Sequence, residues 1–500
     1  MGSNVLWSEY DFSRPFFNQF RSLFEDVPHP NLIQRNCINS EYANYALNQK
    51  NTYLVGGGET AEDSAYLFGS NIRIRNCFDT YRVGDTEFSY EIVDCEKSSH
   101  IYFSQNCVAC SNSVFLYDCR NCQNCFGCVG LRNKQYYIFN KPYPKEEYEK
   151  EVKELRMGSR QSINRIKDEF EKLKLKIPRK FAWIIKSENV VGDDIMNSRN
   201  CHHCFNARNN IENCKYSYRL FENTKDGYDA FVVWNNTELF YEVFSVSGQN
   251  VIGSALIWGG FNIRYSYNCF DCNNIFGCVG LRNKQYCFFN KQYTKDEYEV
   301  LVGKAEKHMR EMPYIDAMGR KYGYGEFFPS EIAPFSYNES VAQGYFPKTK
   351  DQALQLGFAW REEEERDYKI TKQQEEIPDD IEGVPNNFTE EIIECAHKGR
   401  CDDHCATVFR VIPQELEFLK NVGLPLPVLC PICRRAERVK SRNPLKLWHR
   451  QCMCDYQVFQ NTTKHTHHET GKCPNEFETS YSPDRKEIVY CEQCYQAEVV

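Results

Sequence analysis

The last 106 residues hold ten of the 26 cysteines, and their spacing is typical of metal ligands. Two CxxC pairs, Cys430–Cys433 and Cys491–Cys494, each follow a more widely spaced pair of cysteines. Zinc prefers four soft ligands in a tetrahedron, and a CxxC presents two thiolates from one tight turn. The sequence therefore predicts two structural Zn²⁺ sites.

The ligands of these sites are assigned from the repeated order of the cysteines. Site one takes Cys405, Cys430 and Cys433, with either Cys395 or Cys401. Site two takes four cysteines: Cys452, Cys473, Cys491 and Cys494. In both sites a loose pair precedes a strand-like run, and helix-like sequence follows the CxxC, where the helix dipole favours thiolate. This order predicts tandem treble-clef zinc fingers, with buried free thiols or a redox CxxC as the alternative.

The stretch between Cys452 and Cys473 contains four more side chains of ligand type: Cys454, His465, His467 and His468. These histidines could substitute as ligands or form a third site with Cys454. Histidine without a matched spacing is mostly not a ligand, which favours a solvent-exposed polar insertion.

A basic segment follows the first CxxC. Its seven cations are Arg434, Arg435, Arg438, Lys440, Arg442, Lys446 and Arg450, and Trp448 is available for stacking. A basic helix on a zinc module is a reasonable surface for nucleic acid or a ribonucleoprotein. A solvated helix face is the alternative.

The elements that must position these groups begin with a duplication. The string FGCVGLRNKQY occupies residues 126–136 and recurs unchanged at 276–286, and looser similarity extends on both sides. The first 312 residues therefore hold two copies of one unit. We expect Phe126 and Phe276 to occupy equivalent positions. Arg132–Gln135 and Arg282–Gln285 could bind two similar ligands such as phosphates, although a polar turn between strands is the simpler interpretation.

Both copies are predicted to be β-structure. Short β-branched or aromatic runs recur every 11 to 14 residues, which fits a sandwich, a barrel or a β-solenoid. Eight Asn-Cys dyads favour a parallel, β-helix-like solenoid, because Asn tolerates left-handed corners and Cys is small enough to stack inside a narrow coil. We expect coils of roughly 22 residues with two strands each.

The cysteines of the β region raise a second metal question. CxxCxxCxxC from Cys119 to Cys128 is similar to an iron–sulfur run. The second copy, however, has Ile275 in place of Cys125, and an apolar replacement favours packing over ligation.

The expected organisation is a mainly β chain with capping helices. Residues 1–50 form a helical cap whose apolar face, from Phe16 to Phe24, closes off the end of the β unit after it. The copies occupy 51–180 and 181–312, and each ends in a helix; one helix is interrupted at Gly158 and the other begins at Thr294 with a capping box. An aromatic and then acidic linker spans 313–394, and the zinc domain spans 395–500.

Composition restricts the setting. The net charge of −8 gives no global nucleic-acid signature, and no run approaches 18 apolar residues. The first residues lack the layout of a signal peptide, so we expect a cytoplasmic protein without membrane association. In that compartment, 26 cysteines are not a disulfide framework.

Four stretches resemble a family of cysteine-rich proteins common in bacteria of the candidate phyla. They are NCFGCVGLRNKQYYIFNKPYPKEEYEKEV, FRVIPQELEFLKNVGLPLPVLCPIC, RNPLKLWHRQC and CPNEFETSYSPDRKEIVYCEQCY. The resemblance implies zinc, with Cys395 paired to Cys405 and Cys452 paired to Cys473. It implies no activity.

The leading functional hypothesis is a non-enzymatic zinc-binding scaffold or binding protein. Its partners would be nucleic acid, a ribonucleoprotein, or proteins bound through the solenoid. The alternatives are a solenoid enzyme acting on a polymer, for which no pair of carboxylates is evident, and an iron–sulfur or redox protein.

Overall fold

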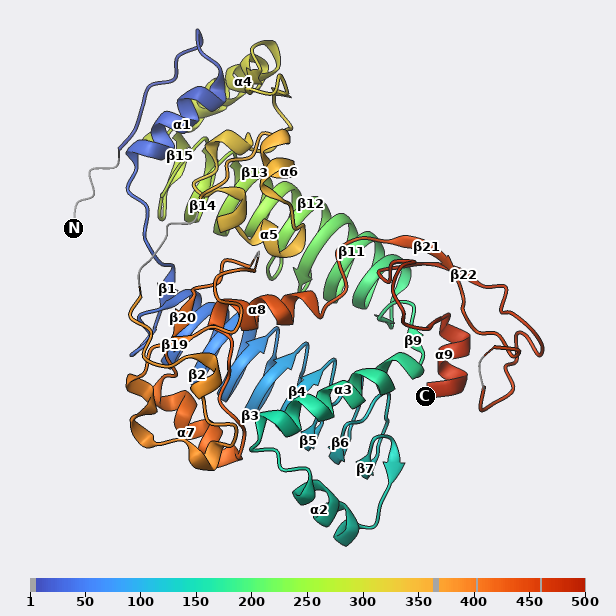
Figure 1. Cartoon of the computed structure of the whole chain (residues 1–500). Coiled ribbons are helices and arrows are strands. Elements are labelled where there is room, and N and C mark those ends of the chain that lie inside the picture. The colour runs from blue at the N-terminus through green and yellow to red at the C-terminus, as the bar shows by residue number, and fades with distance from the viewer. Residues whose placement is uncertain (1–5, 363–367, 402, 459–460, 500) are drawn as a thin grey trace.

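The computed structural model describes residues 6–362, 368–401, 403–458 and 461–499, and it is dominated by two long parallel sheets (Figure 1). The eight-stranded sheet runs in the order β1 to β8. Its strands are Gln34–Arg35, Ala43–Tyr81, Gly84–Val93, Ser99–Gln105, Ser111–Val114, Gln123–Phe126, Gln135–Ile138 and Lys141–Pro142.

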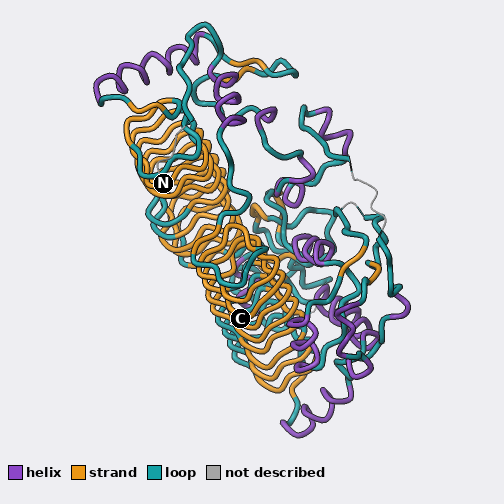
Figure 2. Tube along the Cα trace, turned by 90° about the vertical axis from the view of Figure 1, so that its left-hand side faces the viewer, coloured by secondary structure: helices purple, strands orange, loops and turns teal. Residues whose placement is uncertain are grey.

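The seven-stranded sheet belongs to the second copy and runs in the order β10 to β16. Its strands are Ile184–Ile185, Glu188–Phe221, Lys225–Val233, Glu238–Arg264, Tyr267–Phe276, Gln285–Phe288 and Lys291–Gln292. Figure 2 shows the strands of the chain stacked one above another along a long column.

The stacking period is shorter than the sequence analysis predicted. In the first sheet each residue pairs with the residue 12 positions later, as Ile72 does with Gly84. In the second sheet the offset is 13 for Cys214 and Gly227 and 12 for Ala255 and Tyr267. The 12 or 13 residues between paired positions are here called a rung. The expected coil of roughly 22 residues was wrong, because each short run is a rung by itself.

Each rung turns through left-handed corners at a spacing of three residues. From Asp94 to Asn124, every third residue has a positive φ. The residue after each corner points inward and is buried: Cys95, Ser98, Ile101, Ser104, Cys107, Cys110, Ser113, Leu116, Cys119, Cys122 and Cys125. A rung of 12 residues thus has four corners and four interior side chains.

The Asn-Cys dyads follow this rule, as expected. All eight asparagines have a positive φ: Asn36, Asn76, Asn106, Asn121, Asn124, Asn200, Asn213 and Asn268. Asn and Asp enter this conformation at the lowest cost among residues with a side chain. Corner amides also bond between rungs, as from Asn121 Nδ2 to Asn133 Oδ1 at 2.7 Å.

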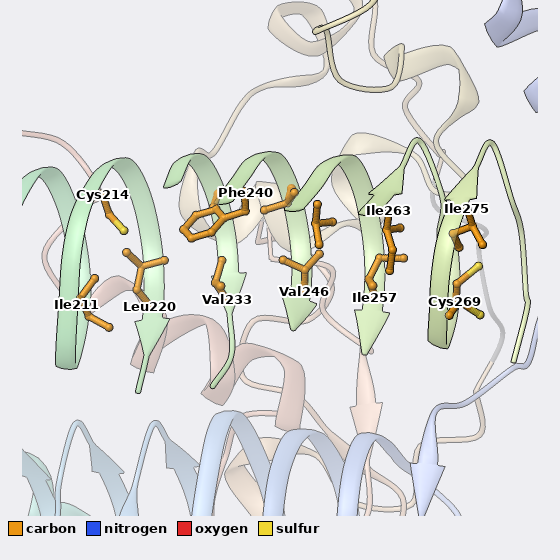
Figure 3. Packing of buried hydrophobic residues seen from close by; sticks show 14 of the residues in the cluster. Ile211, Cys214, Leu220, Val233, Phe240, Val246, Ile257, Ile263, Cys269 and Ile275 are labelled. Atoms are coloured by element: carbon orange, nitrogen blue, oxygen red, sulfur yellow. The ribbon is translucent and has the colours of Figure 1, made fainter. Parts of the chain in front are cut away.

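The interior is a narrow column of small and medium side chains. Figure 3 shows Ile211, Leu220, Val233, Ile257 and other buried residues stacked along the second unit. Interior hydroxyls link the rungs: Ser98 Oγ donates to Glu96 O at 2.9 Å and accepts from the amide of Cys110 at 3.2 Å.

Both sheets end in a strand that turns back. β8 is antiparallel to β7, and β16 is antiparallel to β15, whereas the preceding pairs are parallel. In β8 both residues, Lys141 and Pro142, are exposed.

The duplicated strings occupy equivalent places. Phe126 pairs with Val114 on one side and Ile138 on the other, and Phe276 pairs with Arg264 and Phe288 at the same offsets. Both phenylalanines are fully buried. The helix after each copy also repeats one ring contact: Tyr136–Tyr148 at 5.6 Å and Tyr286–Tyr298 at 5.9 Å between centroids.

The helices lie at the ends and along one side of the sheets. The first copy is followed by α2 (Lys145–Glu154) and α3 (Arg160–Lys176), which confirms the predicted interruption near Gly158. The second copy is followed by α4 (Lys295–Glu311), with the expected capping box at Thr294. None of the described helices is long and apolar enough to cross a lipid bilayer.

The N-terminal helix α1 (Phe16–Asp26) does not close off the first copy, which comes next in the chain. Its apolar face packs on the far end of the second copy, where Phe16 contacts the rings of Tyr265 and Phe276 (Figure 1). The expectation was wrong because an apolar helical face shows that it is buried and not against what.

The segment between the second copy and the cysteine-rich region has little regular structure. It contains the short pair β17 (Tyr314–Ile315) and β18 (Lys321–Tyr322), and two short helices, α5 (Val341–Tyr345) and α6 (Lys350–Gln355). Single turns of 3₁₀ helix lie at Ser330–Ile332, Tyr337–Glu339, Gln374–Glu376, Ile381–Gly383 and Asn386–Glu390.

Gly227 tests the interior packing. A Cβ added there would overlap the ring of Phe240, the interior residue of the next rung (Figure 3). Gly227→Ala is expected to lower the free energy of unfolding by about 1–3 kcal/mol, the usual range for overpacking. Urea denaturation measures the change. Gly303→Ala in α4 is the control, since its Cβ meets no atom within 4 Å; an equal loss in both variants would contradict the packing.

Candidate metal centres

The cysteine-rich region contains two modules with the same local layout. In the first, β19 (Ile393–Glu394) leads into Cys395 and pairs antiparallel with β20 (Val408–Phe409), which follows Cys405. In the second, β21 (Trp448–Gln451) leads into Cys452 and pairs antiparallel with β22 (Glu476–Thr479). The loose cysteine pair of each module therefore lies in the loop of a hairpin, as expected.

Each CxxC lies at the start of a helix. α8 (Pro431–Lys440) begins directly after Cys430, and α9 (Glu492–Val499) begins directly after Cys491. An additional helix, α7 (Pro413–Val422), lies between the hairpin and the CxxC of the first module. In the second module this place is taken by β23 (Val489–Tyr490), which pairs with β9 (Arg179–Lys180).

Two cysteine tetrads result. The Sγ atoms of Cys395, Cys405, Cys430 and Cys433 lie within 4.8 Å of one another, and so do those of Cys452, Cys473, Cys491 and Cys494. A zinc ion with Zn–S bonds of about 2.3 Å in a tetrahedron separates its sulfurs by ~3.8 Å. The Cys395–Cys433 separation is 4.0 Å and the Cys473–Cys491 separation is 3.9 Å. Both tetrads are compatible with a structural metal ion.

The two centres share a backbone contact. The amide of Cys430 donates to Cys395 Sγ at 3.2 Å, and the amide of Cys491 donates to Cys452 Sγ at 3.2 Å. Hydrogen bonds from the neighbouring thiols of Cys395 and Cys433 lower the pKa of Cys430, and those of Cys452 and Cys494 lower the pKa of Cys491. Each centre therefore favours a thiolate, the form that binds a metal.

Cys401 lies beside the first tetrad. Its Sγ is 3.6 Å from Cys433 Sγ, and with His397 it forms a second, smaller group around Cys433. Cys405 completes the tetrad from the hairpin. The tetrad therefore contains Cys395, which the sequence left as an alternative to Cys401.

The insertion with the three histidines is not an exposed loop. His465 is 1% exposed and Cys454 is fully buried, while His467 and His468 are half-buried. The favoured interpretation of a solvent-exposed insertion was wrong, because the chain folds back over the second tetrad.

The basic segment is largely turned inward. Arg434 and Arg438 are buried, Arg442 has a side chain 11% exposed, and Arg435 and Arg450 are half-buried. Arg435 stacks over Phe68, and Arg450 donates to the carbonyls of Tyr481 and Ser482. The exposed cations of the seven are Lys440, which pairs with Asp403, and Lys446, which stacks on Trp448.

The buried arginines join the first module to the first sheet. Asp79 in β2 is fully buried; one of its carboxylate oxygens accepts from Arg434, and the other accepts from Arg438 at 2.6 Å. Arg434 also bonds Glu415 of α7 at 2.6 Å. Burial opposes the charge of Arg434, yet the carboxylates of Asp79 and Glu415 outweigh burial and raise its pKa. Burial raises the pKa of Glu415.

The second module contacts the repeated polar string of the first copy. Arg132 reaches Asp118 Oδ1 at 3.0 Å and the hydroxyl of Tyr495 in α9 at 3.0 Å, and Tyr495 donates to Asp118. In the second copy Asn268 occupies the place of Asp118, and Arg282 lies over the ring of Phe270. The two strings are identical, but in the first copy Arg132 helps to hold the metal module.

The two copies also contact each other beside the modules. Arg82 of the first copy pairs with Asp194 of the second at 2.6 Å, and Arg208 of the second pairs with Glu96 of the first. Asn443, just after α8, lies 3.3 Å from Asp193 of the second copy.

The interior cysteines of the sheets behave as packing residues. None of them belongs to a group of three or more metal-ligating side chains among the residues described here. Their thiols donate to backbone carbonyls, as Cys95 does to Val93 O at 3.3 Å. Burial raises the pKa of Cys77 and of Cys269 to about 12, which keeps both neutral.

Comparisons with known proteins add little. No family model matches the chain, and no curated protein matches it. One solved structure, described as a candidate acetyltransferase from Desulfovibrio desulfuricans G20, aligns with 59% of this chain and 87% of its own at 10% identity and a TM-score of 0.11. This likeness carries no argument about fold or function.

Proposed function

We propose that this protein is a non-enzymatic scaffold in which two zinc-binding modules fix two β-solenoids in one arrangement. The modules are treble-clef zinc fingers, and each tetrad holds one structural Zn²⁺. Four thiolates in a tetrahedron are the ligand set of structural zinc sites. The resemblance to a cysteine-rich bacterial family agrees with zinc and stays a prediction.

The observation that carries this proposal is the position of α8. Its CxxC supplies two ligands of the first tetrad, and the same helix inserts Arg434 and Arg438 into the buried carboxylate of Asp79. The segment after α8 continues to the second copy through Asn443. Metal binding would therefore order the element that contacts both units, which is the work of a structural clamp.

Metal removal tests the proposal. The protein as purified is expected to contain zinc, and chelation should make the tetrad cysteines reactive to a maleimide while interior cysteines such as Cys95 and Cys107 stay protected. Structural zinc supplies folding free energy on the order of 10 kcal/mol, so its loss unfolds the module. Peptide mass spectrometry identifies the labelled cysteines. Protein that lacks zinc as purified, or tetrad cysteines that stay unreactive after chelation, would contradict the proposal.

Nucleic-acid binding stays a prediction that the geometry narrows. A phosphate backbone needs exposed cations, and in the basic segment those are Lys440 and Lys446. Their replacement by Ala is the appropriate test in a gel shift at low salt. Replacing Arg434 or Arg438 would instead disrupt the contact with Asp79.

A further inference from the structure

A second group of ligand atoms lies directly beside the second tetrad. Cys454 Sγ is 3.5 Å from His465 Nδ1 and 3.4 Å from His468 Nε2, and the two ring nitrogens are 3.2 Å apart. Cys494 Sγ, already part of the tetrad, is 3.5 Å from His468 Nε2. These four atoms all lie within 4.8 Å of one another.

The partner of His465 fixes which of its nitrogens is free. Glu498 Oε1 lies 2.9 Å from His465 Nε2, and a carboxylate only accepts, so Nε2 carries the proton. Nδ1 of the neutral ring then has a lone pair directed at the group. An imidazole whose second nitrogen donates to a carboxylate is the usual arrangement of a metal-bound histidine.

Hydrogen bonding within the group does not account for it. One proton shared between the two rings would satisfy that contact, but two cysteine sulfurs converge on the same atoms. His468 would also keep its buried Nδ1, which has no hydrogen-bond partner. Two imidazole nitrogens and two sulfurs form a tetrahedral ligand set suited to zinc.

We propose that the second module holds a binuclear zinc cluster. One ion is bound by Cys452, Cys473, Cys491 and Cys494, and the other by Cys454, His465 and His468, with Cys494 as a bridging thiolate. The inference rests on the proposed zinc binding at the second tetrad.

The charge of the centre favours the second ion. Four thiolates around one Zn²⁺ carry a net charge of −2, whereas five thiolates around two Zn²⁺ carry −1, and the tetrad lies in a buried cluster. Burying the smaller charge requires less compensation. Asn461 Nδ2 donates to Cys454 Sγ at 3.2 Å, and Asn475 Nδ2 donates to Cys491 Sγ at 3.3 Å, so both ends of the cluster have an amide donor.

His467 does not belong to the proposed set. Its Nε2 lies 3.2 Å from Cys494 Sγ and 3.4 Å from Cys473 Sγ, on the side of the first ion. It is the alternative ligand of this module, and its substitution distinguishes the two arrangements.

Native mass spectrometry of the intact full-length chain counts the ions. Three Zn²⁺ per chain are expected: one in the first module and two in the second. Two ions would overturn the binuclear cluster and leave the proposed zinc scaffold intact. No zinc would overturn both.

Single substitutions locate the additional ion. His465→Gln and His468→Gln are each expected to lose one Zn²⁺, while His467→Gln and the exposed control His449→Gln keep all three. Loss of zinc from His467→Gln but not from His465→Gln would overturn the assignment.

Cobalt substitution gives a readout that does not depend on a folded variant. In wild-type protein loaded with Co²⁺, a bridging thiolate couples two of the three ions, so most of the paramagnetic resonance signal of that pair is lost. Three uncoupled Co²⁺ signals would overturn the bridge through Cys494.

Discussion

Cys433→Ser is expected to lose the metal ion of the first module and to unfold that module without unfolding the β-sheets. Cys433 is fully buried in the first turn of α8, and Ser replaces its thiolate with a poor zinc ligand. The folding free energy from one structural zinc is on the order of 10 kcal/mol, more than a small module retains without it. Hydrogen exchange should show loss of protection over residues 393–440 and continued protection over 84–138.

The matched control for this variant is Cys95→Ser. Cys95 is buried inside a rung, where Ser98 and Ser104 occupy the same kind of position. A hydroxyl is therefore compatible with that site, and both zinc content and protection of α8 should remain. Full zinc content and a protected α8 in Cys433→Ser would show that the tetrad is not a structural metal site.

Asp79→Ala is expected to have the largest effect of any change outside the metal ligands. It removes the carboxylate that faces both Arg434 and Arg438, and both guanidinium groups stay buried. Glu415 still pairs with Arg434, but Arg438 loses this ionic partner. Removing one partner of a buried ion pair costs about 3–5 kcal/mol. Urea denaturation followed by tryptophan fluorescence measures the loss.

The control uses an ion pair on the surface of the same sheet. Arg75 and Glu87 are 2.7 Å apart, with side chains 53% and 44% exposed. Glu87→Ala should change the free energy of unfolding by no more than about 1 kcal/mol, because water screens the pair. Adding Arg434→Met and Arg438→Met to Asp79→Ala should recover much of its loss, since no buried charge then lacks a partner. Equal losses from Asp79→Ala and Glu87→Ala would contradict the buried contact.

The parts of the fold that depend on local chemistry could be predicted from the sequence. The Asn-Cys dyads indicated a left-handed corner followed by an interior position, and all eight asparagines adopt that conformation. The capping box at Thr294 and the helix start at each CxxC are equally local. The rung length was missed because the three-residue spacing of corners also uses residues such as Phe103 and Lys97, which give no turn signal.

The parts that depend on distant partners could not be predicted. Arg434, Arg438 and Arg442 share a spacing of four, which places them on one helical face but does not say whether that face meets water. The residue that decides this is Asp79, which is 355 positions from Arg434. His465 shows the same limit, since Glu498, which orients its ring, comes 33 residues later.

The reversed strands β8 and β16 bear on how this protein can assemble. A stack of parallel strands ordinarily ends in a row of open amide and carbonyl groups, onto which another chain can add. Here the last strand of each sheet runs in the opposite direction, and in β8 Pro142 has no amide to offer. An incoming strand would meet the wrong polarity at that end. The length of each column is therefore set within a single polypeptide, and fibre growth from these ends is not expected to increase with protein concentration.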